Sequence, residues 1–264
     1  MIEILQKFSG NGAGDGHPLN KNRFLESLLV EMVTENYRQL VSEALIRSRE
    51  AKTTKRVRLD PPLRANERVA AALVQTALSR VAIRSRTEGR VERNGGASTG
   101  RIDHLAWYAN HVIGIELKIA RMALRLENEQ VSDDVSEGEV KTLARVENPW
   151  RSVLEQSASA LDTLRNLKQK DHKLYPRPLS LPLMLVVGQR RVQEDALAEM
   201  DKNIGIYRKA FIEALPKNSV NYLAVYTAPW EHRVACERAY GKTDREKDGV
   251  MYIPFYAFLS SKVG

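Results

Sequence analysis

Apolar residues recur at the three-and-four spacing of an amphipathic helix in two stretches near the N-terminus, residues 22–49 and 60–80. The second stretch opens on Asp60 followed by two prolines, which predicts Asp60 as the helix cap and the prolines in the first turn. The same spacing returns in residues 148–170, and we expect a further helical segment within residues 193–215. Helices are therefore predicted both before and after the middle of the chain.

The period changes to two between residues 81 and 120, where β-branched and aromatic residues are frequent. Ala109 and Asn110 separate two strand-like segments, residues 101–108 and 111–120, and predict a hairpin with a two-residue turn. The other predicted strands are residues 81–93 with a turn at Glu88 and Gly89, residues 181–188 buried on both faces, residues 221–227 and residues 250–259; residues 94–100 are predicted as a loop.

This order of helices and strands predicts an α/β (α+β) fold in which a central mixed β-sheet is flanked by helices. With 43% apolar residues, the 264-residue chain can bury a substantial core. We divide it into an N-terminal helical extension with a basic linker, residues 1–59, and a main domain, residues 60–264. The longest apolar runs, residues 69–74 and 183–187, are far shorter than the roughly 20 residues of a membrane span, so we expect no membrane partner.

The net charge of +8 is unevenly distributed along the chain. Residues 47–101 hold fourteen lysines and arginines against five acids, which favours a polyanionic partner for this stretch. Residues 125–147 reverse the sign, with seven acids against three bases, and are predicted to form a loop or a surface insertion. The candidate nucleic-acid contacts in the basic stretch are Lys52, Lys55, Arg56, Arg58 and Arg101.

The N-terminus and the cysteine content bear on where the protein acts. The chain begins with acidic and then glycine-rich sequence, where a signal peptide would be basic and then apolar. The single cysteine, Cys236, fits a reducing compartment and excludes an intrachain disulfide and a Cys-rich zinc site. We therefore expect the protein to stay in the cytoplasm.

Three residues suited to hydrolytic chemistry lie in the predicted hairpin. If Ala109 and Asn110 form its turn, continued pairing places Asp103 opposite Glu116, with Cβ atoms roughly 5 Å apart on one face. Two opposed carboxylates repel unless a cation lies between them, and a hard divalent metal suits that position. Lys118 follows on the same face by alternation. A metal held by acidic oxygens beside an ammonium favours hydrolysis of phosphodiester bonds.

The pattern of Asp103, twelve intervening residues and then Glu116-Leu117-Lys118 resembles the motif of the PD-(D/E)XK nuclease superfamily. The predicted order of helix, strand, hairpin, helix and strand over residues 60–188 also resembles the restriction-endonuclease-like core of that superfamily. The resemblance implies a metal-dependent nuclease acting on DNA, as an endonuclease in restriction, phage defence, transposition or repair. It also implies Mg²⁺ as cofactor, with Mn²⁺ as a substitute.

The resemblance also assigns roles to individual residues. The catalytic residues that it implies are Asp103, Glu116, Lys118, Glu67 on the helix before the first strand and Gln156 on the helix after the motif; the metal ligands are Asp103, Glu116, Leu117 and Glu67. One large branch of the superfamily has a tyrosine four residues after this glutamine, where the present chain has Ala160. The acidic insertion before Gln156 is a second departure from the family pattern.

Two other interpretations stay open at this stage. The acids and lysine of the hairpin could form an ordinary cross-strand salt bridge, and the protein would then be a non-catalytic nucleic-acid-binding or docking subunit of a larger assembly. A helical-bundle regulator would require residues 101–120 to be helical. The long N-terminal helix and the acidic insertion predict a surface for a second copy, as in a homodimer, or for a partner protein such as a helicase.

Overall fold

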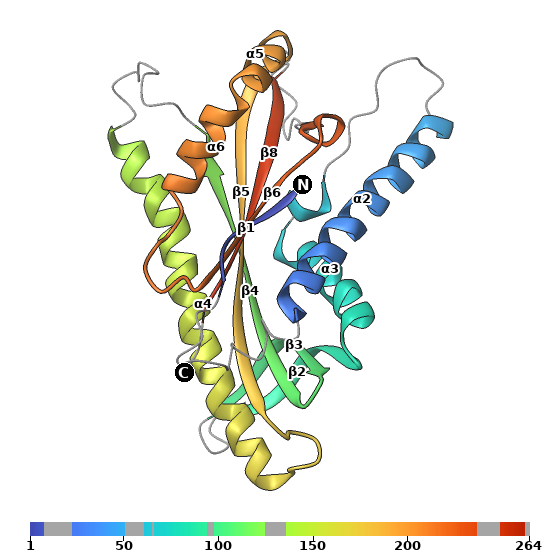
Figure 1. The fold of residues 1–264 in the computed structure, drawn as a ribbon, viewed down its shortest axis with the longest axis vertical. Coiled ribbons are helices and arrows are strands. Elements are labelled where there is room, and N and C mark those ends of the chain that lie inside the picture. Colours follow the sequence, from blue (N-terminus) through green and yellow to red (C-terminus); the bar gives the residue numbers. More distant parts are fainter. Residues whose placement is uncertain are drawn as a thin grey trace.

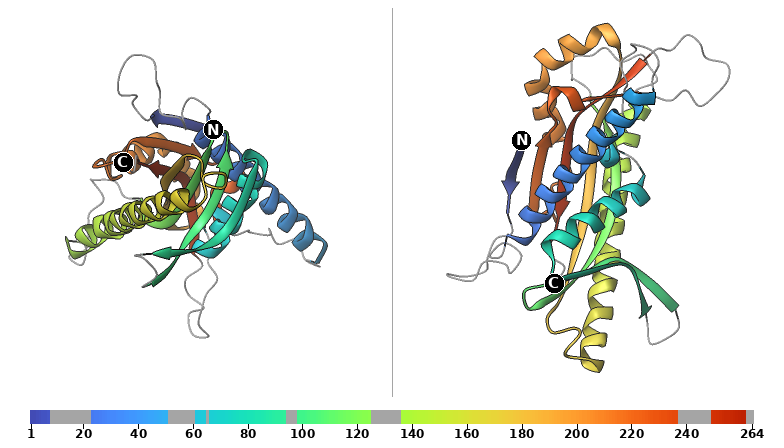
Figure 2. Two further views of the ribbon diagram at one scale, coloured as in Figure 1. Left: turned by 90° about the horizontal axis from the view of Figure 1, so that it is seen from below. Right: turned by 90° about the vertical axis from the view of Figure 1, so that its right-hand side faces the viewer.

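The structure is a computed structural model that describes residues 1–7, 23–50, 61–64, 66–93, 98–124, 136–236 and 249–261. A mixed eight-stranded sheet forms its centre, with helices on both faces (Figures 1 and 2). The elements are β1 (Ile2–Gln6), α2 (Phe24–Glu50), the 3-10 helix η1 (Pro62–Arg64), α3 (Glu67–Val81), β2 (Arg84–Arg93), β3 (Ser98–Tyr108), β4 (His111–Ala123), α4 (Ser136–Lys170), β5 (Pro178–Gln193), η4 (Glu194–Ala196), α5 (Leu197–Lys202), α6 (Ile204–Glu213), β6 (Tyr222–Thr227), η5 (Trp230–His232), β7 (Val234–Cys236) and β8 (Gly249–Ser260). The predicted α/β class is confirmed.

The strands are ordered β1-β6-β8-β5-β4-β3-β2, and β7 pairs with β8 outside this path. β3 and β4 form an antiparallel hairpin, whereas β4 and β5 are parallel. A parallel pair needs a crossover connection, and α4 is the helix in that connection. The remaining neighbours in the sheet are antiparallel.

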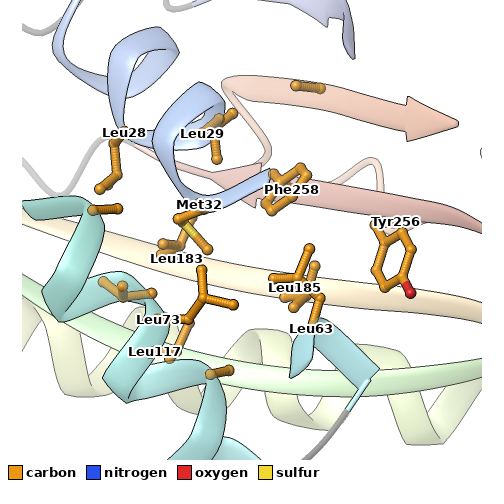
Figure 3. Packing of buried hydrophobic residues seen from close by; sticks show 14 of the residues in the cluster. Leu28, Leu29, Met32, Leu63, Leu73, Leu117, Leu183, Leu185, Tyr256 and Phe258 are labelled. Carbon is orange, nitrogen blue, oxygen red and sulfur yellow. The ribbon is translucent and has the colours of Figure 1, made fainter. Parts of the chain in front are cut away.

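One face of the sheet is covered by α2 and α3. Leucines and Met32 from these helices and from η1 pack against β4, β5 and β8 (Figure 3). The labelled members of this layer are Leu28, Leu29, Met32, Leu63, Leu73, Leu117, Leu183, Leu185, Tyr256 and Phe258. Removal of this apolar area from water is the main contribution of α2 and α3 to stability.

The other face is covered by α4 and α6. Val153 of α4 and Phe211 of α6 belong to a second buried cluster with Met184 and Val186 of β5. Because the alternate residues Leu183 and Leu185 face the first layer, β5 is buried on both sides, as its continuous apolar sequence predicts.

The hairpin prediction is confirmed in its turn and register. Tyr108 pairs with His111 and Trp107 with Val112, so Ala109 and Asn110 form the two-residue turn. Ala109 has a φ of 49°, the left-handed conformation that tight hairpin turns require. Since residues 101–120 lie in β3 and β4 apart from this turn, the helical-bundle interpretation is wrong.

Three local predictions differ from the structure in the segment that leads into the hairpin. The helix predicted to start at Asp60 starts at Glu67, because the prolines form the separate short turn η1 and Asn66 is the cap. Glu88 and Gly89 do not form a turn, since β2 continues through them in pairing with β3. Part of the predicted 94–100 loop belongs to β3, which starts at Ser98.

The acidic segment also differs from prediction, and the N-terminal segment contacts the sheet. Residues 136–147 are the first turns of α4, which continues through Pro149; the rest of the predicted insertion lies outside the described residues. Within residues 1–59, β1 pairs with β6 at the sheet edge, and Phe24 and Leu25 of α2 are buried in the first layer. Ile2 and Ile4 of β1 also pack against this layer, so apolar side chains of both elements contribute to the common core. In the described part of the chain, no helix combines the length and apolarity needed to cross a membrane.

Candidate hydrolytic site at the end of the β3–β4 ladder

The candidate site lies where β3 stops pairing with β4. The last pair of this ladder is His104 with Ile115, whereas β4 continues to pair with β5 as far as Ala123 opposite Gln189. From Glu116 onward, the β4 edge that faces β3 has no ladder partner among the described residues. Backbone groups at this edge are therefore available to side chains.

The Asp103 carboxylate is bound at this edge. The backbone N–H of Leu117 donates a hydrogen bond of 2.8 Å to Oδ2 of Asp103. Asp103 and Glu116 would be the next pair in the predicted register, but the ladder ends one pair earlier. The prediction of a direct cross-strand pair is thus corrected: Asp103 is bonded to the residue that follows Glu116.

A break in strand alternation accounts for this position of Asp103. Ile102 and Leu105 both belong to the buried cluster beside α4. His104 instead contacts α3, with 3.3 Å between its Nδ1 and Oε1 of Gln75. A regular strand would place Ile102 and His104 on one face, so the two-residue period fails between Ile102 and Leu105.

Lys118 is paired with Glu67. Its Nζ lies 3.2 Å from Oε1 of Glu67 in the first turn of α3, and the two side chains are 26% and 49% exposed. Leu117 and Ile119 face the α2–α3 layer, so alternation starts Lys118 on the opposite face. Its ammonium nevertheless contacts Glu67 of α3, on the side of the sheet that α3 covers. This contact supports the prediction that Glu67 and Lys118 belong to one site.

Asn66, which the sequence analysis did not single out, fixes where Glu67 lies. Its side chain accepts a hydrogen bond of 3.1 Å from the N–H of Val69 and caps α3. An N-cap asparagine satisfies a backbone donor that would otherwise lack a partner. The sequence signal was present, since Asn66 and Glu67 directly precede the apolar stripe of α3.

Glu116 and Gln156 complete the predicted catalytic set. Glu116 is only 3% exposed, although it carries a carboxylate. Gln156 is half-buried on α4, between Val153 and Ala160 of the buried stripe, and none of the described residues forms a hydrogen bond with its side chain. The structure thus puts Gln156 on the helix that covers β4, without a contact that gives it a role.

The acids of the candidate site do not form a cluster of three metal ligands among the described residues. Within the residues that the structure describes, no three His, Cys, Asp or Glu side chains are close enough to hold one metal ion. Glu67 is paired with Lys118, and the Asp103 carboxylate is bonded to Leu117. Any metal at this edge would therefore have at most two carboxylate ligands from the described residues.

The candidate nucleic-acid contacts are mostly outside the described residues. This applies to Lys52, Lys55, Arg56 and Arg58. Arg101 is exposed on β3 opposite Arg90 of β2, two residues before Asp103. Of the five predicted contacts, only Arg101 is thus placed near the candidate site.

Comparison of the chain with protein-family models, with curated proteins and with solved structures finds no match. The chemistry of the site is therefore argued from its own residues.

Proposed function

We propose that this protein is a metal-dependent nuclease that hydrolyses phosphodiester bonds of DNA, with Asp103, Glu116 and Lys118 at its catalytic centre. The observation that supports this most is the meeting of three chain segments at the unpaired edge of β4. There the Asp103 carboxylate binds the Leu117 N–H, next to a lysine that is held by Glu67 of α3.

The donor atoms at this edge fit Mg²⁺ chemically. Asp103 and Glu116 offer carboxylate oxygens and Leu117 a backbone carbonyl, which are the hard oxygen ligands that this ion prefers. Magnesium commonly uses one or two protein carboxylates and fills its other positions with water and substrate phosphate oxygens, so a two-carboxylate site is sufficient. When bound, the ion supplies charge neutralisation of the phosphate and an activated water.

The side chains of the site have distinct roles in this proposal. Lys118 orients the attacking water or stabilises the negative charge that develops on the phosphate. Glu67 holds the ammonium of Lys118 in place through the 3.2 Å ion pair. The carboxylate of Glu116 is buried, and in this proposal it is a ligand of the divalent cation. The role of Gln156 as a catalytic residue stays a prediction.

The test is cleavage of supercoiled plasmid and of linear single strands, with Mg²⁺, Mn²⁺, Ca²⁺ or EDTA. We expect cleavage with Mg²⁺ and Mn²⁺, binding without turnover with Ca²⁺, and products with a 5′-phosphate. Glu116→Gln should abolish metal-dependent cleavage, since it removes a charged ligand with little change of shape. Lys118→Ala should slow cleavage by about 100-fold or more, the scale for loss of one electrostatic group.

Lys209→Ala is the matched control for Lys118. Its Nζ lies 4.0 Å from Oε1 of Glu213 on α6, so this variant removes a lysine from an ion pair remote from the proposed centre. It should cleave like the wild type. Equal cleavage by the wild type, Glu116→Gln and Lys118→Ala would show that any activity arises elsewhere. Binding of DNA without cleavage under every metal condition would instead favour the non-catalytic binding subunit.

A further inference from the structure

Two exposed arginines and a half-buried tryptophan form a compact group on the β2–β3 edge of the sheet. Arg84 of β2 is directly opposite Trp107 of β3, and its Cζ lies 5.1 Å from the centroid of the indole ring. The Cζ of Arg86 lies 5.9 Å from the same centroid. Both arginines are exposed at this edge. We call Arg84, Arg86 and Trp107 the arginine platform.

The indole ring of the platform is fixed in position. Its Nε1 donates a hydrogen bond of 2.8 Å to the carbonyl oxygen of Leu174, and the ring packs against the buried cluster beside α4. A guanidinium over an aromatic face is held by the ring quadrupole and keeps its N–H groups for another partner. The platform therefore presents two ordered cations at the surface.

Further cations border the platform. Lys173 precedes Leu174, and the carbonyl oxygen of Arg177 accepts a hydrogen bond of 3.1 Å from Val112, the residue opposite Trp107. Among the described residues, no carboxylate forms an ion pair with Arg84, Arg86, Lys173 or Arg177.

Asp171, the acid in the segment between α4 and β5, accepts hydrogen bonds within its own turn. Its Oδ1 accepts hydrogen bonds from the backbone N–H groups of Lys173 and Leu174, at 3.0 and 3.1 Å. Figure 1 shows the β2–β3 edge and the C-terminal end of α4 at the same lower end of the molecule. The four cations Arg84, Arg86, Lys173 and Arg177 thus outnumber Asp171, the one acid between α4 and β5.

One residue of the platform, Trp107, lies on the same strand as Asp103 of the candidate catalytic centre. Trp107 is four residues from Asp103 along β3, which corresponds to about 13 Å. One nucleic-acid duplex could therefore contact both places.

We propose that the arginine platform, with Lys173 and Arg177, binds the phosphate backbone of the DNA that the catalytic centre cleaves. The identity of the polyanion as DNA rests on the proposed function. Trp107 does not act as a base-stacking surface, because its ring is packed on one side and two guanidiniums lie over it. The contact is therefore to phosphates and independent of sequence.

The experiment measures the affinity of a labelled 20-base-pair duplex at several salt concentrations, in EDTA and in the Lys118→Ala background, so that no cleavage occurs. The Arg84→Gln/Arg86→Gln variant should lower the log–log salt slope by up to about 1.8, at about 0.9 per duplex phosphate neutralised. Between about 50 and 200 mM salt, the affinity of the parent should then fall about tenfold more than that of the variant. Two duplexes of unrelated sequence should give the same result.

Three comparisons make the result specific. Lys202→Gln/Lys217→Gln removes two exposed charges on α5 and after α6 and should leave the slope unchanged. Arg84→Lys/Arg86→Lys should keep most of the slope, because the two charges stay. Thermal unfolding checks that each variant is folded.

Several outcomes would overturn the inference. These are an unchanged slope in the glutamine variant, an equal loss in the Lys202/Lys217 control, or the full loss in the lysine variant. Competition by polyglutamate as strong as that by duplex DNA would assign the platform to acidic chains in general. A lowered slope in a protein that cleaves nothing would refute the proposed nuclease function but keep the phosphate contact. Cleavage with an unchanged slope would keep the proposed nuclease function and refute the phosphate contact of the platform.

Discussion

Acidification should destabilise this protein through His104. The imidazole is fully buried between β3 and α3, and burial lowers its pKa from 6.5 to about 4. Its Nδ1 lies 3.3 Å from Oε1 of Gln75, and its Nε2 has no hydrogen-bond partner in the described part of the chain. A proton added to the folded state would therefore be a buried positive charge.

The sign and size of the effect follow from the two pKa values. Below about pH 6.5 the unfolded chain binds a proton at His104, whereas the folded chain does not bind it until the pH falls to about 4. The stability is thus fully present above pH 6.5 and is lost as the pH falls toward 4. One pKa unit corresponds to about 1.4 kcal/mol, so the loss is about 2 kcal/mol at pH 5 and about 3 kcal/mol near pH 4.

Urea unfolding at pH 7.5 and 5.0 measures this effect in the wild type and in His104→Gln. The glutamine variant cannot titrate at this position and keeps an amide within reach of Gln75. Between the two pH values, the wild type should lose about 2 kcal/mol more stability than the variant. His172→Gln controls for loss of an exposed histidine. If the wild type and His104→Gln lose the same stability on acidification, burial of His104 does not depress its pKa.

Substitutions at Gly188 and Asp103 test the packing against the sheet and the contribution of the Asp103 carboxylate to both stability and cleavage. In Gly188→Ala the new Cβ would lie 2.9 Å from Cε2 of Phe211, and we expect a loss of about 1–3 kcal/mol in urea unfolding. Gly205→Ala, with no atom within 4 Å of its Cβ position, should be neutral or stabilising by less than about 1 kcal/mol. Asp103→Asn keeps an oxygen acceptor for the Leu117 N–H, so it should unfold close to the wild type but lose metal-dependent cleavage, whereas Asp103→Ala should also lose about 1–3 kcal/mol. Equal unfolding of the two Asp103 variants would contradict this role of the hydrogen bond.

The hairpin could be predicted because its signals are local. Ala109 and Asn110 interrupt two strand-like segments, and a two-residue turn fixes the register of every pair that follows. The register of the five observed pairs is the predicted one. The burial of β5 on both faces could also be predicted, since a short continuous apolar run is typical of a central strand.

The end of that ladder could not be predicted, because it depends on where β3 leaves β4 to follow β2. β3 continues to pair with β2 through Ser98 opposite Arg93, while its pairing with β4 stops at His104. The local sequence carries no signal for this divergence. The arginine platform was missed for a similar reason, since cross-strand contact of Arg84 with Trp107 requires the long-range register of β2.

The position of Asp103 links the fold to the proposed chemistry. A strand edge with unpaired N–H groups is a site for unwanted pairing, and β4 has such an edge beyond Ile115. The Asp103 carboxylate occupies one of these donors with a charged acceptor, which keeps the edge open without leaving that N–H unsatisfied. Since Lys118, next to Leu117 on the same strand, is paired with Glu67, Asp103 and this ion pair meet at the end of the ladder, where the proposed chemistry would take place. A substitution that extended the β3–β4 pairing past His104 should therefore displace Asp103 and remove activity even if Glu116 and Lys118 were intact.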